Sequence, residues 1–173
     1  DPLAIADAEI AQSMLAALEG DPRGAIEHAS HAAEAAEGID EKACAFYARV
    51  VAGEQHLLLG EAAKAVPPLE RAQKLAADGA MVPSVSAHCD VLLHSAVARA
   101  AQRPPTLERH DNALALAQSA RDRSIEADLL RQRARDRVAG GGPVDLALAD
   151  YKASEAAFEA LQARPLLAQT RAE

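Results

Sequence analysis

Apolar residues recur three or four positions apart along most of the chain, which is the period of a helix with one buried face. Ile10, Met14 and Leu18 show this spacing within a single segment. Glycine and proline interrupt it at intervals, and both residues favour turns over helix interiors. The pattern predicts eight helices and a short last one, at 2–19, 22–37, 40–59, the stretch between Gly60 and Asp78-Gly79, 83–102, 106–121, 124–139, 144–161 and from 164 onward.

Composition restricts the fold class to all-α. Half of the residues are apolar, and alanine accounts for 44 of 173. Alanine is the strongest helix former, whereas the residues that favour strands are sparse in this chain. Short turns between helices of similar length indicate antiparallel helix hairpins.

Two adjacent prolines, Pro67 and Pro68, lie within the fourth segment. A proline inside a helix removes a backbone donor and clashes with the carbonyl four residues earlier. We expect one helix with either a late start or a kink about one turn in, and with the carbonyls of Ala63 and Lys64 left to water.

Internal repetition becomes visible when Gly20 is aligned with Gly60. The segments LEGDPRGAIEHASHAAEAA and LLGEAAKAVPPLERAQKLA then agree position by position. Ala113 and Ala147 fit the same offset as Ala25 and Ala65. The matched pairs are Leu18 with Leu58, Ala25 with Ala65, Ile26 with Val66, Ala32 with Ala72, and Ala36 with Ala76.

These features resemble a tetratricopeptide repeat (TPR) array, whose unit is a pair of antiparallel helices. The separation of Ala113 and Ala147 equals the length of that unit. AVPPLERA is similar to a run common in the second helix of the family, and Gly53 and Ser13 occupy an offset where the family uses a small residue. The resemblance implies a right-handed α-solenoid that forms one domain over 1–173. Its repeats would be 2–38, 40–79, 82–121 and 124–161, followed by a terminal helix at 164–173.

The final segment, FEALQARPLLAQTRAE, carries a second resemblance. It is similar to the end of the TPR-like region of large bacterial signalling ATPases, including LuxR-type transcriptional regulators of the MalT kind. Phe158, Leu161, Ala163, Pro165 and Arg171 fit that pattern, while Gln162 replaces its usual glycine. The resemblance implies a fragment of a longer protein whose nucleotide-binding domain lies upstream.

The charge balance argues against nucleic acid as a partner. The net charge is −8, whereas proteins that bind phosphate backbones usually carry a basic surface. The sequence contains no apolar run long enough for a membrane span and no signal-peptide pattern, so we expect a cytoplasmic protein. Cys44 and Cys89 are expected to be reduced and buried.

No motif for phosphate or cofactor binding is present. The glycines at 140–142 lack the lysine and hydroxyl residue of a P-loop, so we interpret them as a turn. We expect no cofactor, no metal and no enzymatic activity.

Candidate ligands and nucleophiles do not converge in the sequence. His28 and His31 could share a helix face but have no third ligand nearby, and the spacing of Cys89 and His94 points them in different directions. A core thiol with surface histidines, including His88, explains this region better than a catalytic group.

One helix, 124–139, is rich in arginine. Arg131 and Arg135 share a face and could form a groove for an acidic peptide or a nucleotide. The alternative is a solvated face in which the arginines pair with Glu126, Asp128 and Asp136.

The resemblance also places candidate partner contacts on the first helix of the second pair, at Tyr47, Val50, Glu54 and Leu57. It implies a non-enzymatic module for protein–protein interaction or sensing within a bacterial signalling or transcriptional regulator. The partner would be a protein, a peptide or a neighbouring domain, and exposed ends of the array would allow a homodimer. The alternatives are a free-standing TPR adaptor and a small helical enzyme that depends on a metal or a small ligand.

Overall fold

The computed structural model describes residues 1–172, without the side chains of Ala80, Pro165, Leu167, Gln169 and Ala172. The chain divides into two compact units, Asp1–Val82 and Pro83–Glu173. A single domain over 1–173 therefore stays a prediction, and each unit is described by itself.

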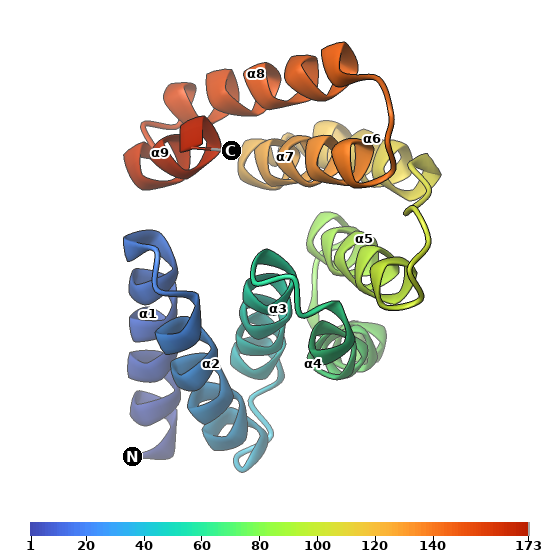
Figure 1. Ribbon diagram of the computed structural model, residues 1–173. Helices are drawn as coiled ribbons and strands as arrows, with labels where there is room; N and C mark the ends of the chain where they lie inside the picture. The colour runs from blue at the N-terminus through green and yellow to red at the C-terminus, as the bar shows by residue number, and fades with distance from the viewer. Residues whose placement is uncertain (173) are drawn as a thin grey trace. The chain divides into compact units, whose positions relative to one another are not determined.

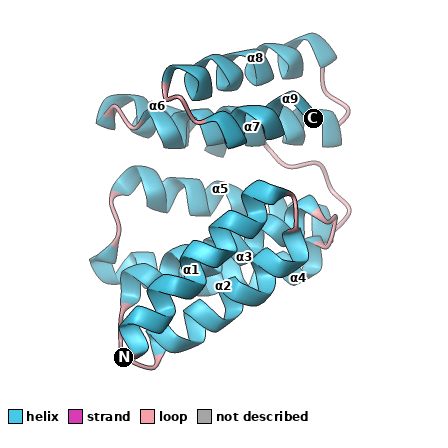
Figure 2. Cartoon of the chain, turned by 90° about the vertical axis from the view of Figure 1, so that its left-hand side faces the viewer, coloured by secondary structure: helices cyan, strands magenta, loops and turns pink. Residues whose placement is uncertain are grey.

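All regular secondary structure in the described part of the chain is helical, and short loops join the helices (Figures 1 and 2). The prediction of an all-α protein is confirmed. The elements are α1 (Pro2–Glu19), α2 (Pro22–Glu37), α3 (Lys42–Leu58), α4 (Ala62–Leu75), a π-helical turn η1 (Ala76–Ala80), α5 (Pro83–Ala100), α6 (Glu108–Ala120), α7 (Arg123–Ala139), α8 (Val144–Ala160) and α9 (Arg164–Ala172).

Most of the helix boundaries predicted from the sequence lie close to those in the structure. The helices predicted at 2–19 and 22–37 are confirmed, and the carboxylates of Asp1 and Asp21 cap them by accepting backbone N–H bonds. The helix predicted at 40–59 begins later, at Lys42, because Asp40 has a φ of 57° and lies outside the helical region. The last residue of the predicted terminal helix, Glu173, lies outside the described residues.

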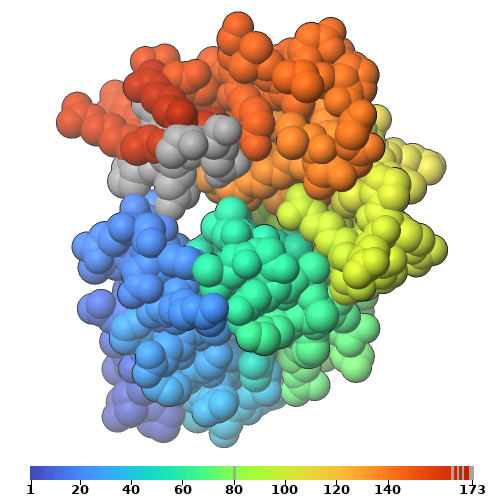
Figure 3. All heavy atoms as spheres, viewed as in Figure 1, coloured from blue at the N-terminus to red at the C-terminus, as the bar shows by residue number. Residues whose placement is uncertain are grey.

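Unit 1 consists of α1 to α4, and each helix packs against the next. Blue atoms of α2 lie directly against blue-green atoms of α3 in the space-filling view (Figure 3). The first helices of the two hairpins, α1 and α3, also contact each other. Small side chains make this close packing possible, and the fully buried alanines of α2 are Ala25, Ala29, Ala32, Ala33 and Ala36.

Gly53 allows the closest approach between α3 and α4. A Cβ atom built at this position would lie 2.4 Å from Cγ of Leu69, well inside contact distance. In the first hairpin, Ser13 is fully buried, and its hydroxyl donates to the carbonyl of Ala25 at 2.9 Å. The small residues at these two positions therefore determine how near the helices of each pair lie.

Helix α4 runs without interruption through Pro67 and Pro68. The prediction of one helix is confirmed, but the alternative of a late start is wrong. The first turn is already formed, because the N–H groups of Lys64 and Ala65 donate to the Glu61 carbonyl. Ala63 and Lys64 are exposed, so water can reach the carbonyls that the prolines leave without a donor.

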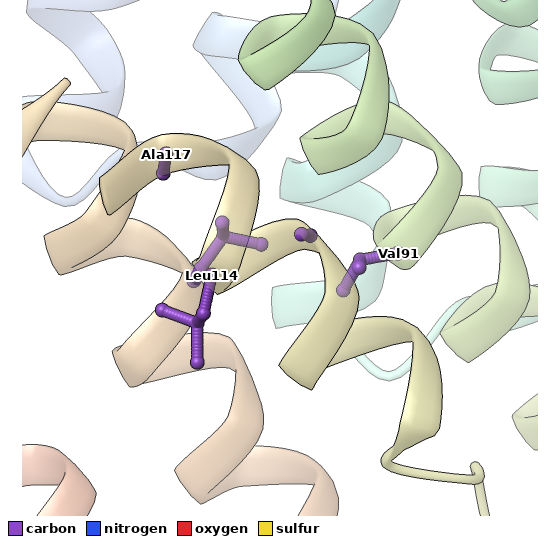
Figure 4. Packing of buried hydrophobic residues seen from close by; sticks show 5 residues of the cluster. Val91, Leu114 and Ala117 are labelled. Atoms are coloured by element: carbon purple, nitrogen blue, oxygen red, sulfur yellow. The ribbon is translucent and has the colours of Figure 1, made fainter. Parts of the chain in front are cut away.

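In unit 2, α5, α6 and α7 surround a small apolar core. Figure 4 shows Val91 of α5 beside Leu114 and Ala117 of α6. Leu129 of α7 and Ala113 complete this buried cluster. Helix α8 packs on α7, and the buried Ser154 hydroxyl donates to the carbonyl of Ala127 at 2.8 Å.

Every junction between consecutive helices contains one residue with positive φ. This left-handed conformation commonly ends helices and favours glycine, because other residues are strained there. Half of these positions are occupied by residues other than glycine. The full set recurs at nearly regular intervals, each the length of one helix and its turn. The positions are Gly20, Asp40, Gly60, Gly79, Gln102, Arg121, Gly141 and Gln162.

Positions within the helices correct the sequence alignment at Ala113. Ala25, Ala65 and Ala147 are each the fourth residue of their helix. Ala113 is instead the sixth residue of α6 and lies much nearer to the junction that ends its helix. Helix α6 starts late, after the loop that contains Pro104 and Pro105. Ala113 and Ala147 therefore do not occupy equivalent positions in their helices, and their separation does not measure a repeat length.

None of the helices in the described region is both long enough and apolar enough to cross a membrane.

Candidate partner-binding groove

A shallow groove of about 370 Å³ lies between α1 and α3, the first helices of the two hairpins in unit 1. From α1 it is lined by apolar side chains and one carboxylate, and α3 contributes Tyr47 at the opposite side. We call it the α1–α3 groove. Its lining residues are Leu3, Asp7, Ile10, Met14, Glu41, Ala43, Cys44 and Tyr47.

The core below holds the groove in place, while its edges remain exposed. Ile10 is half-buried and packs on a cluster of fully buried alanines from α2 and α3. Met14 and Tyr47 are 45% and 40% exposed and line the groove. The Tyr47 ring packs edge-on against the buried Phe46, with ring centroids 5.4 Å apart. The groove therefore presents apolar surface on a rigid base.

Two carboxylates, Asp7 and Glu41, make the groove electronegative. Burial raises the pKa of the Cys44 thiol, and the negative charges of Asp7 and Glu41 raise it further. Cys44 is thus an unreactive, protonated thiol in the groove wall. Glu41 also caps α3 by accepting the N–H of Ala43 at 3.2 Å.

The four residues of α3 that were predicted to contact a partner lie in different environments. Tyr47 lies in the groove, while Val50 and Glu54 are half-buried outside its lining. Leu57 is only 6% exposed, so its side chain belongs to the core and is not available to a partner. Binding through Val50 and Glu54 stays a prediction.

The arginine-rich helix α7 is not a solvated face. Arg131 is 4% exposed, ion-pairs with Asp128 at 2.8 Å and stacks over the Phe158 ring at 5.5 Å. Arg135 is half-buried, with its guanidinium 3.4 Å from Oε1 of Gln132. The solvated alternative is therefore wrong for the exposure of Arg131, whereas the pairing with Asp128 that it predicted is confirmed. Partner binding by Arg131 or Arg135 stays a prediction.

Ion pairs from α7 tie the helices of unit 2 together. Arg133 and Arg137 both donate to the Asp150 carboxylate of α8, at distances of 2.6 to 3.0 Å. Arg133 also pairs with Asp111 of α6 at 2.6 Å. These arginines therefore join α7 to α6 and α8.

Asp136 anchors a polar network inside unit 2, although the sequence predicts a solvated position for it. Asp136 is only 1% exposed. Its carboxylate accepts hydrogen bonds from Ser95 at 2.5 Å, Arg99 at 2.6 Å and Gln132 at 3.2 Å. Nε2 of His110 lies 2.9 Å from the same carboxylate. Burial raises the pKa of Asp136, but the hydrogen bonds from His110 and Ser95 and the charge of Arg99 outweigh it and lower the pKa.

A second pocket, of about 560 Å³, lies between α5 and α6 and is lined mainly by polar groups. Its charges are largely satisfied by its own residues. Asp90 pairs with Arg109 at 2.5 Å, and the hydroxyl of Thr106 lies 2.9 Å from Nε2 of His94. Burial and the nearby positive charge of Arg109 lower the pKa of His94.

The cysteines and histidines are distributed as structural groups. Cys44 and Cys89 are free and buried, as predicted. His88 is buried, so the expectation of a surface histidine there is wrong. His28 instead binds Glu9, with Nδ1 and Oε2 2.7 Å apart. In the described part of the chain, no three His, Cys, Asp or Glu side chains gather as a metal site would require.

Sequence reasoning missed the contribution of α1 to the groove. Leu3, Ile10 and Met14 follow the helical period, which places them on one face of α1. Periodicity alone does not tell whether such a face is buried or exposed. Helix α1 exposes several large apolar residues, and this becomes visible only when the exposure of each side chain is known from the structure.

Comparisons with family models and with curated protein sequences do not assign this chain to a family. No protein-family model matches it, and no curated protein sequence matches it either. The groove and the residues that line it are the features of the chain that bear on its function.

Proposed function

We propose that this chain is a non-enzymatic protein-interaction module of the tetratricopeptide type, and that a partner segment docks in the α1–α3 groove. The exposed side chains of Met14 and Tyr47, which line the groove beside Ile10 on its base of buried alanines, carry this proposal. Exposed apolar surface gathered in one groove is typical of a docking site, whereas scattered exposed residues are not.

The packing of alternate helices supports a repeat architecture of this type. Within unit 1, α1 contacts α3, and within unit 2, α5 contacts α7. In a solenoid of helix hairpins, the first helices of neighbouring pairs meet in this way and form a continuous binding surface. The regular spacing of the left-handed junctions supports the same architecture.

The resemblance of residues 158–173 favours a module within a bacterial signalling or transcriptional regulator over a free-standing adaptor. The sequence of the complete gene distinguishes the two. A regulator requires a nucleotide-binding motif upstream and an effector domain, either DNA-binding or cyclase. Absence of both leaves the adaptor.

A site-specific photo-crosslinker tests docking in the groove. We would place it at position 47 of the full-length protein, and at position 70, an exposed site on α4, as the control. The proposal expects a discrete crosslink to a protein, or to another domain of the same chain, from position 47 and not from position 70. Identical products from both positions, or none from position 47, would contradict it.

A further inference from the structure

Charge on α1 distinguishes the α1–α3 groove from a neutral apolar surface. The helix PLAIADAEIAQSMLAALE carries three acids, Asp7, Glu9 and Glu19, and contains neither lysine nor arginine. Glu9 is engaged by His28 and, at 4.0 Å, lies near His31. Asp7 points its charge into the groove, where no basic side chain of the described residues forms an ion pair with it.

A second carboxylate, that of Glu41, lines the same groove. Glu41 lies at the start of α3, and its charge and that of Asp7 both act on the Cys44 thiol. The groove therefore combines apolar side chains at Leu3, Met14 and Tyr47 with two carboxylates that have no cationic partner among the described residues.

We infer that the occupant of the α1–α3 groove is a basic amphipathic helix, a conclusion that rests on the proposed function. An apolar row along such a helix covers Met14 and Tyr47, and lysine or arginine beside that row meets Asp7 and Glu41. An acidic helix would bring like charges together at the groove. A second copy of this chain docking α1 on α1 would do the same, because α1 contains no lysine or arginine.

Two synthetic helical peptides test the chemistry of the partner. Both carry leucines at the same heptad positions, and the remaining positions are lysine in one and glutamate in the other. Fluorescence anisotropy with the full 173-residue chain measures their affinities. We expect the lysine peptide to bind at least about tenfold more tightly, with an affinity that falls as salt is raised.

Matched charge reversals distinguish the groove from general attraction to an acidic protein. Asp7→Lys should weaken binding of the lysine peptide about fivefold, whereas Glu70→Lys on α4, with the same change in net charge, should change it less than about twofold. Both positions are exposed, so circular dichroism should show unchanged helicity for both variants. Equal effects of the two substitutions, or tighter binding of the glutamate peptide, would overturn the inference about charge.

The apolar part of the groove is tested separately with Met14→Ser and Tyr47→Ala. If these variants weaken binding of whichever peptide binds while Asp7→Lys does not, docking in the groove stands and the basic partner is wrong. If neither variant changes peptide binding and position 47 gives no crosslink, the proposed function itself fails.

Discussion

At the scale of single residues, Gly53 determines how closely α3 and α4 pack. Alanine would gain about 1 kcal/mol in helix propensity, but its Cβ would overlap Leu69 at 2.4 Å. We expect the overlap to dominate, so that Gly53→Ala lowers the free energy of unfolding by about 1–3 kcal/mol in urea denaturation. Gly38→Ala is the control, because its Cβ meets neighbours at an ordinary 3.4 Å. Equal effects at the two positions would contradict the close approach of α3 and α4.

Asp136 supports a prediction about acid stability. Its folded pKa lies below its ordinary value of 3.8, so its stabilising effect is complete well above 3.8 and is lost as the pH falls from there through the lower pKa of the folded state. Asp136→Asn should lower the free energy of unfolding at pH 7 by about 3 kcal/mol, because Arg99 and His110 lose their charged partner. The variant should also lose less stability than the original chain between pH 6 and pH 3 in parallel urea titrations.

Glu159→Gln provides the control for Asp136, because this exposed glutamate lies on α8 in the same unit. It should change stability by less than about 0.5 kcal/mol. If Asp136→Asn and the original chain lose stability in parallel as the pH falls, the network does not hold a charged carboxylate.

At the scale of elements, α4 is a helix that retains two prolines in its interior. Replacing both Pro67 and Pro68 by alanine supplies N–H donors to the carbonyls of Ala63 and Lys64. Proline also restricts the unfolded chain, which offsets part of this gain. We expect a net stabilisation of about 1 kcal/mol or more, measured as a higher urea midpoint.

The control for α4 is Pro22→Ala, since Pro22 occupies the first turn of α2, where no donor is needed. It should leave stability unchanged or slightly lower. Stabilisation of the same size at Pro22 would mean that the interior position of the α4 prolines is not the cause.

Glycine gives a local reason for some of the predicted helix ends. Gly20 and Gly60 are recognisable as stops, and the structure places both in the left-handed conformation. Gln102 and Arg121 adopt the same conformation, but their side chains do not indicate it. The predicted helices therefore run slightly past the ends that these two residues form.

At the scale of the whole molecule, helical periodicity predicted the fold class because it is a local property. The groove and the buried network were not predictable in the same way, since both depend on contacts between distant segments. His110 and Asp136 are 26 residues apart in sequence, and no spacing rule joins them. Tyr47 was anticipated only through a family resemblance, and its partner residues on α1 were missed.

The division into two units gives a prediction at this scale. All the helix contacts of α1 to α4 described above are made within residues 1–82, so this segment contains its own core. A fragment of residues 1–82 should be helical by circular dichroism and should unfold cooperatively on heating. A spectrum typical of an unfolded chain would show that the segment depends on the remainder of the protein.

The left-handed junctions have a consequence for how the chain can change in length. Because a residue with positive φ lies at each end of a helix pair, a segment such as 41–79, which contains α3 and α4, can be treated as one cassette. Duplicating or deleting one cassette preserves the course of the backbone at both joints, whereas an insertion of another length inside a helix does not. Growth by whole cassettes would lengthen the chain without rebuilding the turns already present.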